Sequence, residues 1–142
     1  MSIWTHVAGV ARVDDLRLGS SEDEVRKINE YFDKIFGKVL KYEDSSENWD
    51  YAESHESEYM PMGSEGSLIK SVWINPERDH VAAYTVSVFG DLRDYDEPEK
   101  IIEWFKEACS KCAIRNAIIT AECERGKSLT WTWSHKEEES NE

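Results

Sequence analysis

Few side chains in this sequence have the types and spacing that chemistry requires. Cys109 and Cys112 form a C-x-x-C pair, a spacing shared by thiol redox motifs and metal sites. In redox proteins the pair lies at a helix N-terminus, where the helix dipole lowers a thiol pKa. Here it falls in the last turns of an expected helix, so we interpret both thiols as core or near-surface residues. A zinc site with Cys123 and His135 stays open, although its spacing matches no common structural module.

The remaining candidates for acid–base chemistry are scattered. None of the histidines has a serine or cysteine beside it in a nucleophile motif; they are His6, His55, His80 and His135. Acid pairs such as Asp14-Asp15 are expected by chance among 30 acidic residues. The acids of the stretch 44–53 lack the spacing and central glycine of a calcium loop, which leaves only weak calcium binding open. The sequence therefore predicts a non-enzymatic protein, with no catalytic residue, assigned metal site or cofactor.

The most pronounced feature of the composition is an excess of acidic residues, concentrated in one stretch of the chain. Asp and Glu number 30 against 17 Lys and Arg, a formal net charge of −13. Residues 43–58 include seven acids and no Lys or Arg, which is more than half of that excess. Aromatic residues in and beside this stretch either pin it to the domain or contact a partner. The predicted partner-binding residues are Glu43, Asp44, Glu47, Trp49, Asp50, Tyr51, Glu53, Glu56 and Glu58, and Tyr59 follows them.

This charge restricts the kinds of partner that the protein can bind. An isoelectric point near 4.7 implies repulsion of phosphate backbones and anionic lipid, so neither nucleic acid nor membrane is an expected partner. A basic protein is favoured instead, because opposite net charge speeds association. The chain has no apolar run near the roughly 18 residues of a membrane span, and its start lacks a secretory signal. With an odd number of cysteines, these features predict a cytoplasmic protein.

A second polar cluster, Gly90-Asp91-Leu92-Arg93-Asp94-Tyr95, follows an expected strand. In one interpretation it connects that strand to the next helix, and Arg93 folds back onto its acidic neighbours. In the other, Arg93 binds an anionic small ligand such as a nucleotide phosphate, with His6 or Arg12 nearby. The flanking acids oppose an anion and favour the connection. The alternative ligand-binding residues are therefore His6, Arg12 and Arg93, and the oligomeric state is open, with a dimer allowed.

The elements that position these residues follow from hydrophobic periodicity. Residues 3–13 alternate with a period of two and have no purely polar face, which indicates a central strand. Ser21 and Glu24 form a capping box that starts a helix. The apolar stripe of that helix is Val25, Ile28, Phe32, Ile35, Phe36 and Val39.

Two hairpins and a second helix are expected after the acidic stretch. Residues 67–74 and 80–89 predict a hairpin closed by the turn 75–79. The second helix begins near Asp96, with Pro98 in its first turn. Its apolar stripe is Ile101, Ile102, Phe105, Ala108, Cys109 and Cys112. Residues 117–123 and 129–133 form the last hairpin.

The order β-α-β-β-α-β-β predicts an α+β fold of the ferredoxin-like, split βαβ type, with a C-terminal strand added. Both helices would cover one face of an antiparallel sheet. We expect one domain, residues 1–136, with an acidic insertion at 43–66 and a flexible acidic tail at 137–142. The uncovered sheet face is an expected binding platform unless the insertion covers it. It could include Trp4, His6, Trp73, Trp131 and Trp133.

Three short motifs resemble a group of small, uncharacterised proteins encoded by bacteriophages. They are Met1-Ser2-Ile3-Trp4-Thr5-His6, Gly63-Ser64-Glu65-Gly66 and Gly90-Asp91-Leu92-Arg93-Asp94. The resemblance covers the ends of three expected strands and neither the acidic stretch nor the last hairpin. It implies a phage origin and an accessory role in the host cytoplasm, and it supplies no catalytic residues.

By analogy with small acidic phage proteins that inhibit host defence, the leading expectation is an anti-CRISPR-like inhibitor. Its acidic surface would bind a basic, nucleic-acid-handling host protein in place of nucleic acid. Two other hypotheses stay open. One is a small-ligand binder, or sponge, that sequesters a nucleotide defence signal; the other is a structural or accessory phage protein whose acidic loop is only solvated.

Overall fold

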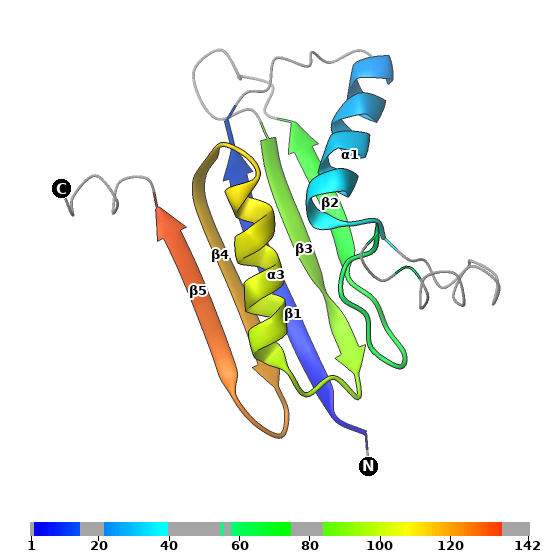
Figure 1. The fold of residues 1–142 in the computed structure, drawn as a ribbon, viewed down its shortest axis with the longest axis vertical. Helices are drawn as coiled ribbons and strands as arrows, with labels where there is room; N and C mark the ends of the chain where they lie inside the picture. Colours follow the sequence, from blue (N-terminus) through cyan, green and yellow to red (C-terminus); the bar gives the residue numbers. More distant parts are fainter. Residues whose placement is uncertain (1, 15–21, 40–54, 56–57, 75–83, 135–142) are drawn as a thin grey trace.

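The computed structural model describes residues 2–14, 22–39, 55, 58–74 and 84–134. Five strands form one sheet in the order β2-β3-β1-β4-β5, in which every neighbouring pair is antiparallel (Figure 1). The elements in chain order are β1 (Trp4–Val13), α1 (Glu22–Phe36), β2 (Ile69–Ile74), β3 (Tyr84–Arg93), α3 (Pro98–Ser110), β4 (Ile114–Cys123) and β5 (Ser128–Ser134). β1 therefore lies at the centre of the sheet, as its alternation predicted.

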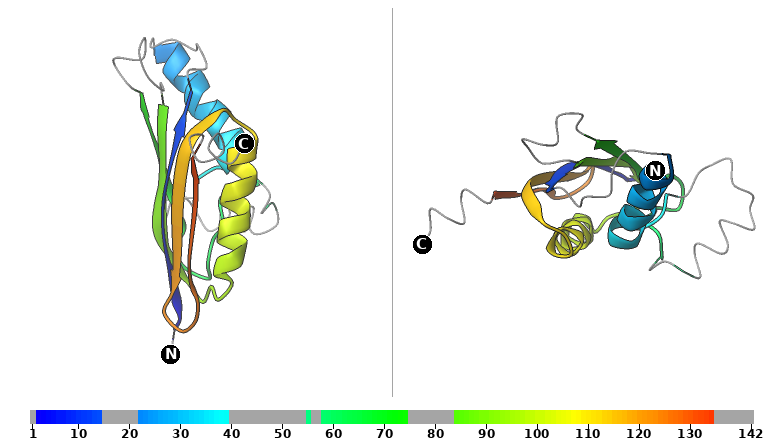
Figure 2. Two further views of the ribbon diagram at one scale, coloured as in Figure 1. Left: turned by 90° about the vertical axis from the view of Figure 1, so that its left-hand side faces the viewer. Right: turned by 90° about the horizontal axis from the view of Figure 1, so that it is seen from above.

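Both helices pack on the same face of the sheet (Figure 2). The core lies between the two layers, because strands that alternate with a period of two direct every second side chain toward the helices. Val7, Ala11 and Val13 of β1 are buried there, and Phe32 and Phe105 meet them from the helices. The expected α+β class, with two helices on one face of an antiparallel sheet, is confirmed. Neither helix among the described residues is long and apolar enough to cross a membrane.

Both expected helices are present, but α1 ends at Phe36, so Val39, the last residue of its expected stripe, follows the helix. The expected capping pair Ser21 and Glu24 lies outside the described side chains. In α1 the residues at helical spacing, Ile28, Phe32 and Phe36, are almost fully buried. Pro98 occupies the first turn of α3, where its missing N–H costs no hydrogen bond. α3 ends at Ser110, so Cys112 follows the helix and packs against the core only in part.

Two predictions about the sheet are wrong. β3 continues to Arg93, so the expected strand-to-helix connection at 90–93 is strand, and Leu92 extends the inward alternation of Val86 and Val88. Trp131 and Trp133 are on the helix side rather than on the open face. The ring of Trp131 lies 6.1 Å from that of Phe105, and the two tryptophans share a face because they are two residues apart.

The end of the expected insertion belongs to the core. Met60 is 3% exposed and Leu68 is fully buried, so the chain from 58 to 68 packs along the domain before β2 begins. The turn expected at 75–79, the tail 137–142 and most of the acidic stretch lie outside the described residues.

Candidate functional site

The described residues of the three short motifs, 2–6, 63–66 and 90–94, meet at one end of the sheet, where β1 begins and β3 ends. The amide of Asp94 donates to the Ile3 carbonyl at 2.6 Å. The amide of Arg93 donates to the Glu65 carbonyl at 3.0 Å, and the amide of Ser64 donates to the Arg93 carbonyl at 2.9 Å. Segments far apart in the sequence therefore form one hydrogen-bonded corner.

Glycines allow the backbones to approach so closely at this corner. Gly66 has a φ of +83°, and a Cβ there would overlap the carbonyl oxygen of Asp91. A Cβ on Gly63 would overlap the backbone of Arg93. Any side chain at either position would push the 63–66 turn away from β3.

Arg93 is engaged in ion pairs and hydrogen bonds within the corner. Its Nη1 lies 2.7 Å from Glu65 Oε1, and its Nε donates to Ser2 Oγ at 2.8 Å. Asp94 Oδ2 is farther from Nε, at 3.9 Å. The main carboxylate partner is thus Glu65, from a segment 28 residues earlier, and the arginine joins three pieces of chain. This arrangement favours the connecting role over the anion-binding role.

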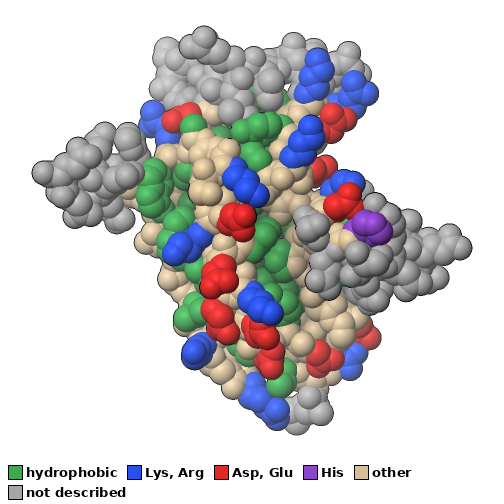
Figure 3. Space-filling model, in the orientation of Figure 1, with side chains coloured by type: hydrophobic (Ala, Val, Ile, Leu, Met, Phe, Trp, Pro, Cys, Tyr) green, Lys and Arg blue, Asp and Glu red, His purple; other side chains and the backbone are tan. Residues whose placement is uncertain are grey.

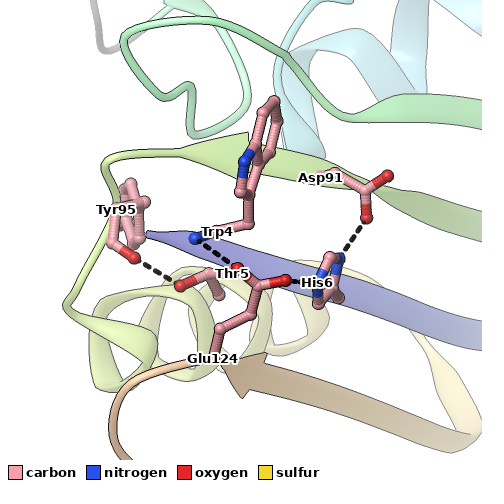
Figure 4. Close-up of polar contacts among 6 residues, drawn as sticks. All are labelled: Trp4, Thr5, His6, Asp91, Tyr95 and Glu124. Atoms are coloured by element: carbon pink, nitrogen blue, oxygen red, sulfur yellow. Dashed lines mark hydrogen bonds and ion pairs between the residues drawn. The ribbon is translucent and has the colours of Figure 1, made fainter. Parts of the chain in front are cut away.

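His6 lies between two carboxylates that come from different elements (Figure 4). Its Nδ1 is 2.6 Å from Asp91 Oδ1 on β3, and its Nε2 is 2.9 Å from Glu124 Oε2 in the β4–β5 turn. The hydrogen bond to Asp91, then that to Glu124, raises the pKa of His6 above its ordinary 6.5. When the ring is protonated, both of its nitrogens donate to these carboxylates, and neither has a lone pair left to bind a metal. The cluster therefore joins β1 to β3 and to the β4–β5 turn.

Glu124 also fixes the first residues of β1. Its Oε1 accepts from the amide of Trp4 at 3.2 Å, while its own amide donates to the Trp4 carbonyl at 3.0 Å. Next to it, the buried hydroxyl of Thr5 donates to the carbonyl of Tyr95. Sequence reasoning missed Glu124, because nothing local marks one acid in a polar turn as the partner of residues 118 or more positions away.

The three residues of the alternative ligand site do not converge. His6 and Arg93 lie near each other on the open face, but Arg12 is six residues farther along β1, about 20 Å away. Its Nη1 donates to Asn116 Oδ1 at 2.8 Å. A single small anion could not contact all three side chains.

The acidic stretch leaves and rejoins the domain at one point. The amide of Lys38 donates to the Glu58 carbonyl at 2.9 Å, and the amide of Met60 donates to the Lys38 carbonyl at 3.1 Å. Gly37 makes this closure possible, because its φ is +108° and a Cβ would lie 2.6 Å from the nitrogen of Met60. Glu58 and Tyr59 are part of the closure. The other predicted partner-binding residues, from Glu43 to Glu56, lie outside the described residues.

Beside this closure a cavity of about 710 Å³ lies between the two helices. Phe36, Tyr59, Met60 and Trp104 are among its lining residues, and the indole of Trp104 donates to the Phe36 carbonyl at 2.8 Å. Lysines and carboxylates both lie at its edge: Lys100 pairs with Glu97 at 2.5 Å, and Lys34 also lines the cavity. Figure 3 views this helix side, where hydrophobic side chains alternate with charged ones of both signs.

The cysteines do not form a reactive or metal-binding group. Burial raises the pKa of Cys109 to about 12 and that of Cys112 to about 11. Cys123 is at the far end of β4, about 30 Å from the end that follows Cys112. The four residues that the sequence left open as a zinc set therefore do not come together, because Cys123 is far from the other two thiols; His135 lies outside the described residues. In the described ranges no three His, Cys, Asp or Glu side chains converge as metal ligands would.

The negative charge is divided unevenly between the described and the other residues. Side chains that the structure describes include 14 acidic and 13 basic ones. The remaining residues have 16 acids and four Lys or Arg. The sheet, α3 and most of α1 are thus almost neutral, and the excess acid lies elsewhere in the chain.

Comparison of the chain with protein-family models, with curated proteins and with solved structures found no match. The resemblance to phage proteins stays a prediction that rests on its three motifs.

Proposed function

We propose that this chain is a non-enzymatic binding protein whose acidic segment, residues 43–58, docks on a basic groove of a nucleic-acid-handling protein. The observation that carries the proposal is the division of charge. Because the described side chains are nearly neutral, electrostatic attraction to a basic partner has to come from the other segments. Among these, residues 43–58 are the longest stretch with many acids and no Lys or Arg.

The closure at Lys38 and Tyr59 supports the proposal in a second way. A segment held at both ends on a packed domain loses less entropy on binding than a free tail of equal charge. Trp49 and Tyr51 would then supply the buried aromatic anchors that most protein interfaces need. Charge would set the rate of association, and the aromatic residues would set its specificity.

The partner's chemistry follows from the segment's own. Grooves that hold nucleic acid are lined by Lys and Arg, and guide-dependent nucleases hold a heteroduplex in such a channel. An acidic protein that occupies the channel competes with nucleic acid directly. Together with the phage motifs, this favours an anti-CRISPR-like counter-defence protein, which would meet its target in the bacterial cytoplasm.

The direct test changes the charge of the segment and nothing else. In the test variant each Glu of 43–58 becomes Gln and each Asp becomes Asn. A matched control neutralises Glu99, Glu103 and Glu107, exposed acids of α3. Binding to a captured basic partner should weaken about tenfold or more in the test variant and little in the control. The affinity of the test variant should also depend less on salt concentration than that of the parent. Equal binding by parent and test variant would refute the proposal.

The cavity between the helices favours a second candidate function, a small-ligand binder that sequesters a nucleotide signal. Its volume suits such a ligand, and Trp104 and Tyr59 offer aromatic surface to a base. A panel of mono-, di- and cyclic nucleotides in a thermal-shift assay separates the two functions, because a ligand of the native state raises Tm. If deletion of 43–58 changes neither assay, the third hypothesis, an accessory protein with a solvated loop, is the better one.

We also propose that the fold is ferredoxin-like with β5 as an added edge strand. In support, β3 separates β1 from β2, and β1 separates β3 from β4, so each helix connects strands that are not neighbours. A solved structure of a related chain with the same order would test this relationship.

A further inference from the structure

The sheet face opposite the helices has the most unusual surface of the described residues. Every large hydrophobic side chain that is exposed in the described ranges lies on it: Ile69 at 50%, Trp73 at 54%, Phe89 at 49% and Ile118 at 45%. They come from three different strands, so the patch is formed by the fold and not by one apolar run. Apolar patches of this kind mark contacts with another macromolecule.

The strand register places three of these residues, Ile69, Phe89 and Ile118, in an uncharged band across the sheet, and Trp73 lies in the adjoining row with Thr85 and Arg12. Two rows form the band: Ile69-Phe89-Ala8-Thr120-Thr130 and Ser71-Ser87-Val10-Ile118-Thr132. In a chain with 33% charged residues, ten adjacent positions without charge require an explanation. The simplest explanation is that these side chains are removed from water when a partner binds, because burial of an unpaired charge is costly and burial of these uncharged side chains is not.

We propose that a second copy of this chain covers the band, with the two sheets face to face. Three strands of ten residues and two of six and seven residues, about 4.8 Å apart and rising about 3.3 Å per residue, present roughly 700 Å². A standard interface buries about 800 Å² on each partner, so this face alone nearly suffices for a stable dimer. Packed sheets lie about 10 Å apart, which leaves room for one layer of side chains from each.

Charges at the two ends of the face select the orientation. Arg12 lies at one end of the band, and Asp91 and Glu122 flank the His6 position at the other. A two-fold axis that crosses the strands between the two rows places Arg12 of one copy over the partner's His6 position, between the two acids. An axis parallel to the strands places the acids of one copy over the acids of the other and is disfavoured.

The same crosswise axis matches large side chains with small ones. The first row of one copy falls over the second row of the other, so Phe89 faces Ser87 and Ile69 faces Ser71. On the other side of β1, Ile118 faces Thr120. Alternation of large and small side chains lets two layers interdigitate at the density of a protein interior. Neutral composition, charge and side-chain size therefore lead to the same arrangement.

This dimer is independent of the function proposed above. The helices, the cavity and the closure at Lys38 lie on the side away from the open face. Loss of the dimer and loss of partner binding are separate outcomes in experiments.

Sedimentation velocity of the full chain from about 1 to 100 μM tests the proposal. We expect a dimer, and a monomer when Ile118→Lys or Phe89→Asp introduces a charge into the band. Both positions are exposed in a single copy, so circular dichroism should remain native. Ala113→Lys, at an exposed position before β4, is the matched control and should leave the dimer intact. A monomer at every concentration, or a dimer indifferent to Ile118→Lys, would overturn the proposal.

A charge exchange tests the crosswise axis. Arg12→Glu and Glu122→Arg should each weaken dimerisation about tenfold, and the double variant should restore it to within about threefold of the parent. Additive weakening in the double variant would refute this axis. If the protein is monomeric and binds single-stranded oligonucleotide, and if Phe89→Asp abolishes that binding, the face is a nucleic-acid surface and the dimer is wrong.

Discussion

At His6, two carboxylates favour the protonated form of one exposed ring. Its pKa is raised mainly by Asp91 and then by Glu124, and Glu122 is opposite it on β4. A folded-state pKa above the unfolded value means that this contribution to stability is complete below about pH 6.5. It is lost as the pH rises through the folded-state pKa.

We therefore predict that the free energy of unfolding falls between pH 6 and 9 by less than about 1 kcal/mol from this cluster, since the groups are well exposed. Asp91→Asn should move the His6 pKa back toward 6.5, and His6→Gln should flatten the decline. Ring resonances in an NMR titration and urea unfolding at several pH values measure both effects. A His6 pKa at or below 6.5 in the parent protein would contradict the cluster.

The buried thiols give a second prediction at this scale. With pKa values of about 12 and 11, Cys109 and Cys112 should have very little thiolate at pH 8. In a Cys123→Ala background, we expect native protein to react with iodoacetamide about 100-fold or more slowly than urea-unfolded protein. Fast native alkylation, or ready oxidation to a Cys109–Cys112 disulfide, would restore the redox interpretation of the C-x-x-C motif.

At the scale of elements, Gly37 controls how the acidic segment joins α1 to the rest of the domain. Gly37→Ala should cost about 1–3 kcal/mol, because it combines a positive φ with a clash against the Tyr59–Met60 backbone. Hydrogen exchange at the Lys38 and Met60 amides should speed up most. Gly126→Ala, where the nearest atom to a Cβ is 3.9 Å away, should change stability by less than about 0.5 kcal/mol. Equal effects of both substitutions would refute the role of the closure.

Hydrophobic periodicity was sufficient to predict most helices and strands. It did not predict where β3 ends or which face of the sheet the tryptophans of β5 occupy. The apolar stripes of α1 and α3 and the alternation of β1 are local, so the sequence contains them in full. Gly90-Asp91 resembles a turn locally, yet Leu92 is drawn into the core and keeps β3 extended. The side on which Trp131 lies depends on the register of β5 against β4, which only packing decides.

At the scale of the whole molecule, net charge misrepresents how the charge is distributed. The sequence suggested a strongly negative face, whereas the described side chains are nearly balanced. The partners of His6 and Arg93 could not be predicted either, because Glu124 and Glu65 approach them only after the sheet has formed. The tertiary contacts thus explain the acids at one end of the sheet as structural, which leaves residues 43–58 as the main candidate for binding.

The most direct test of binding through residues 43–58 compares the proteins captured by the parent chain with those captured by the variant neutralised at 43–58. Each would be immobilised, incubated with nuclease-treated bacterial lysate at low and high salt, and analysed by quantitative mass spectrometry. We predict that the parent enriches a basic, nucleic-acid-binding protein that is lost at high salt and is lost in the variant neutralised at 43–58. The same enrichment by both proteins, or enrichment of no basic protein by the parent, would contradict the account.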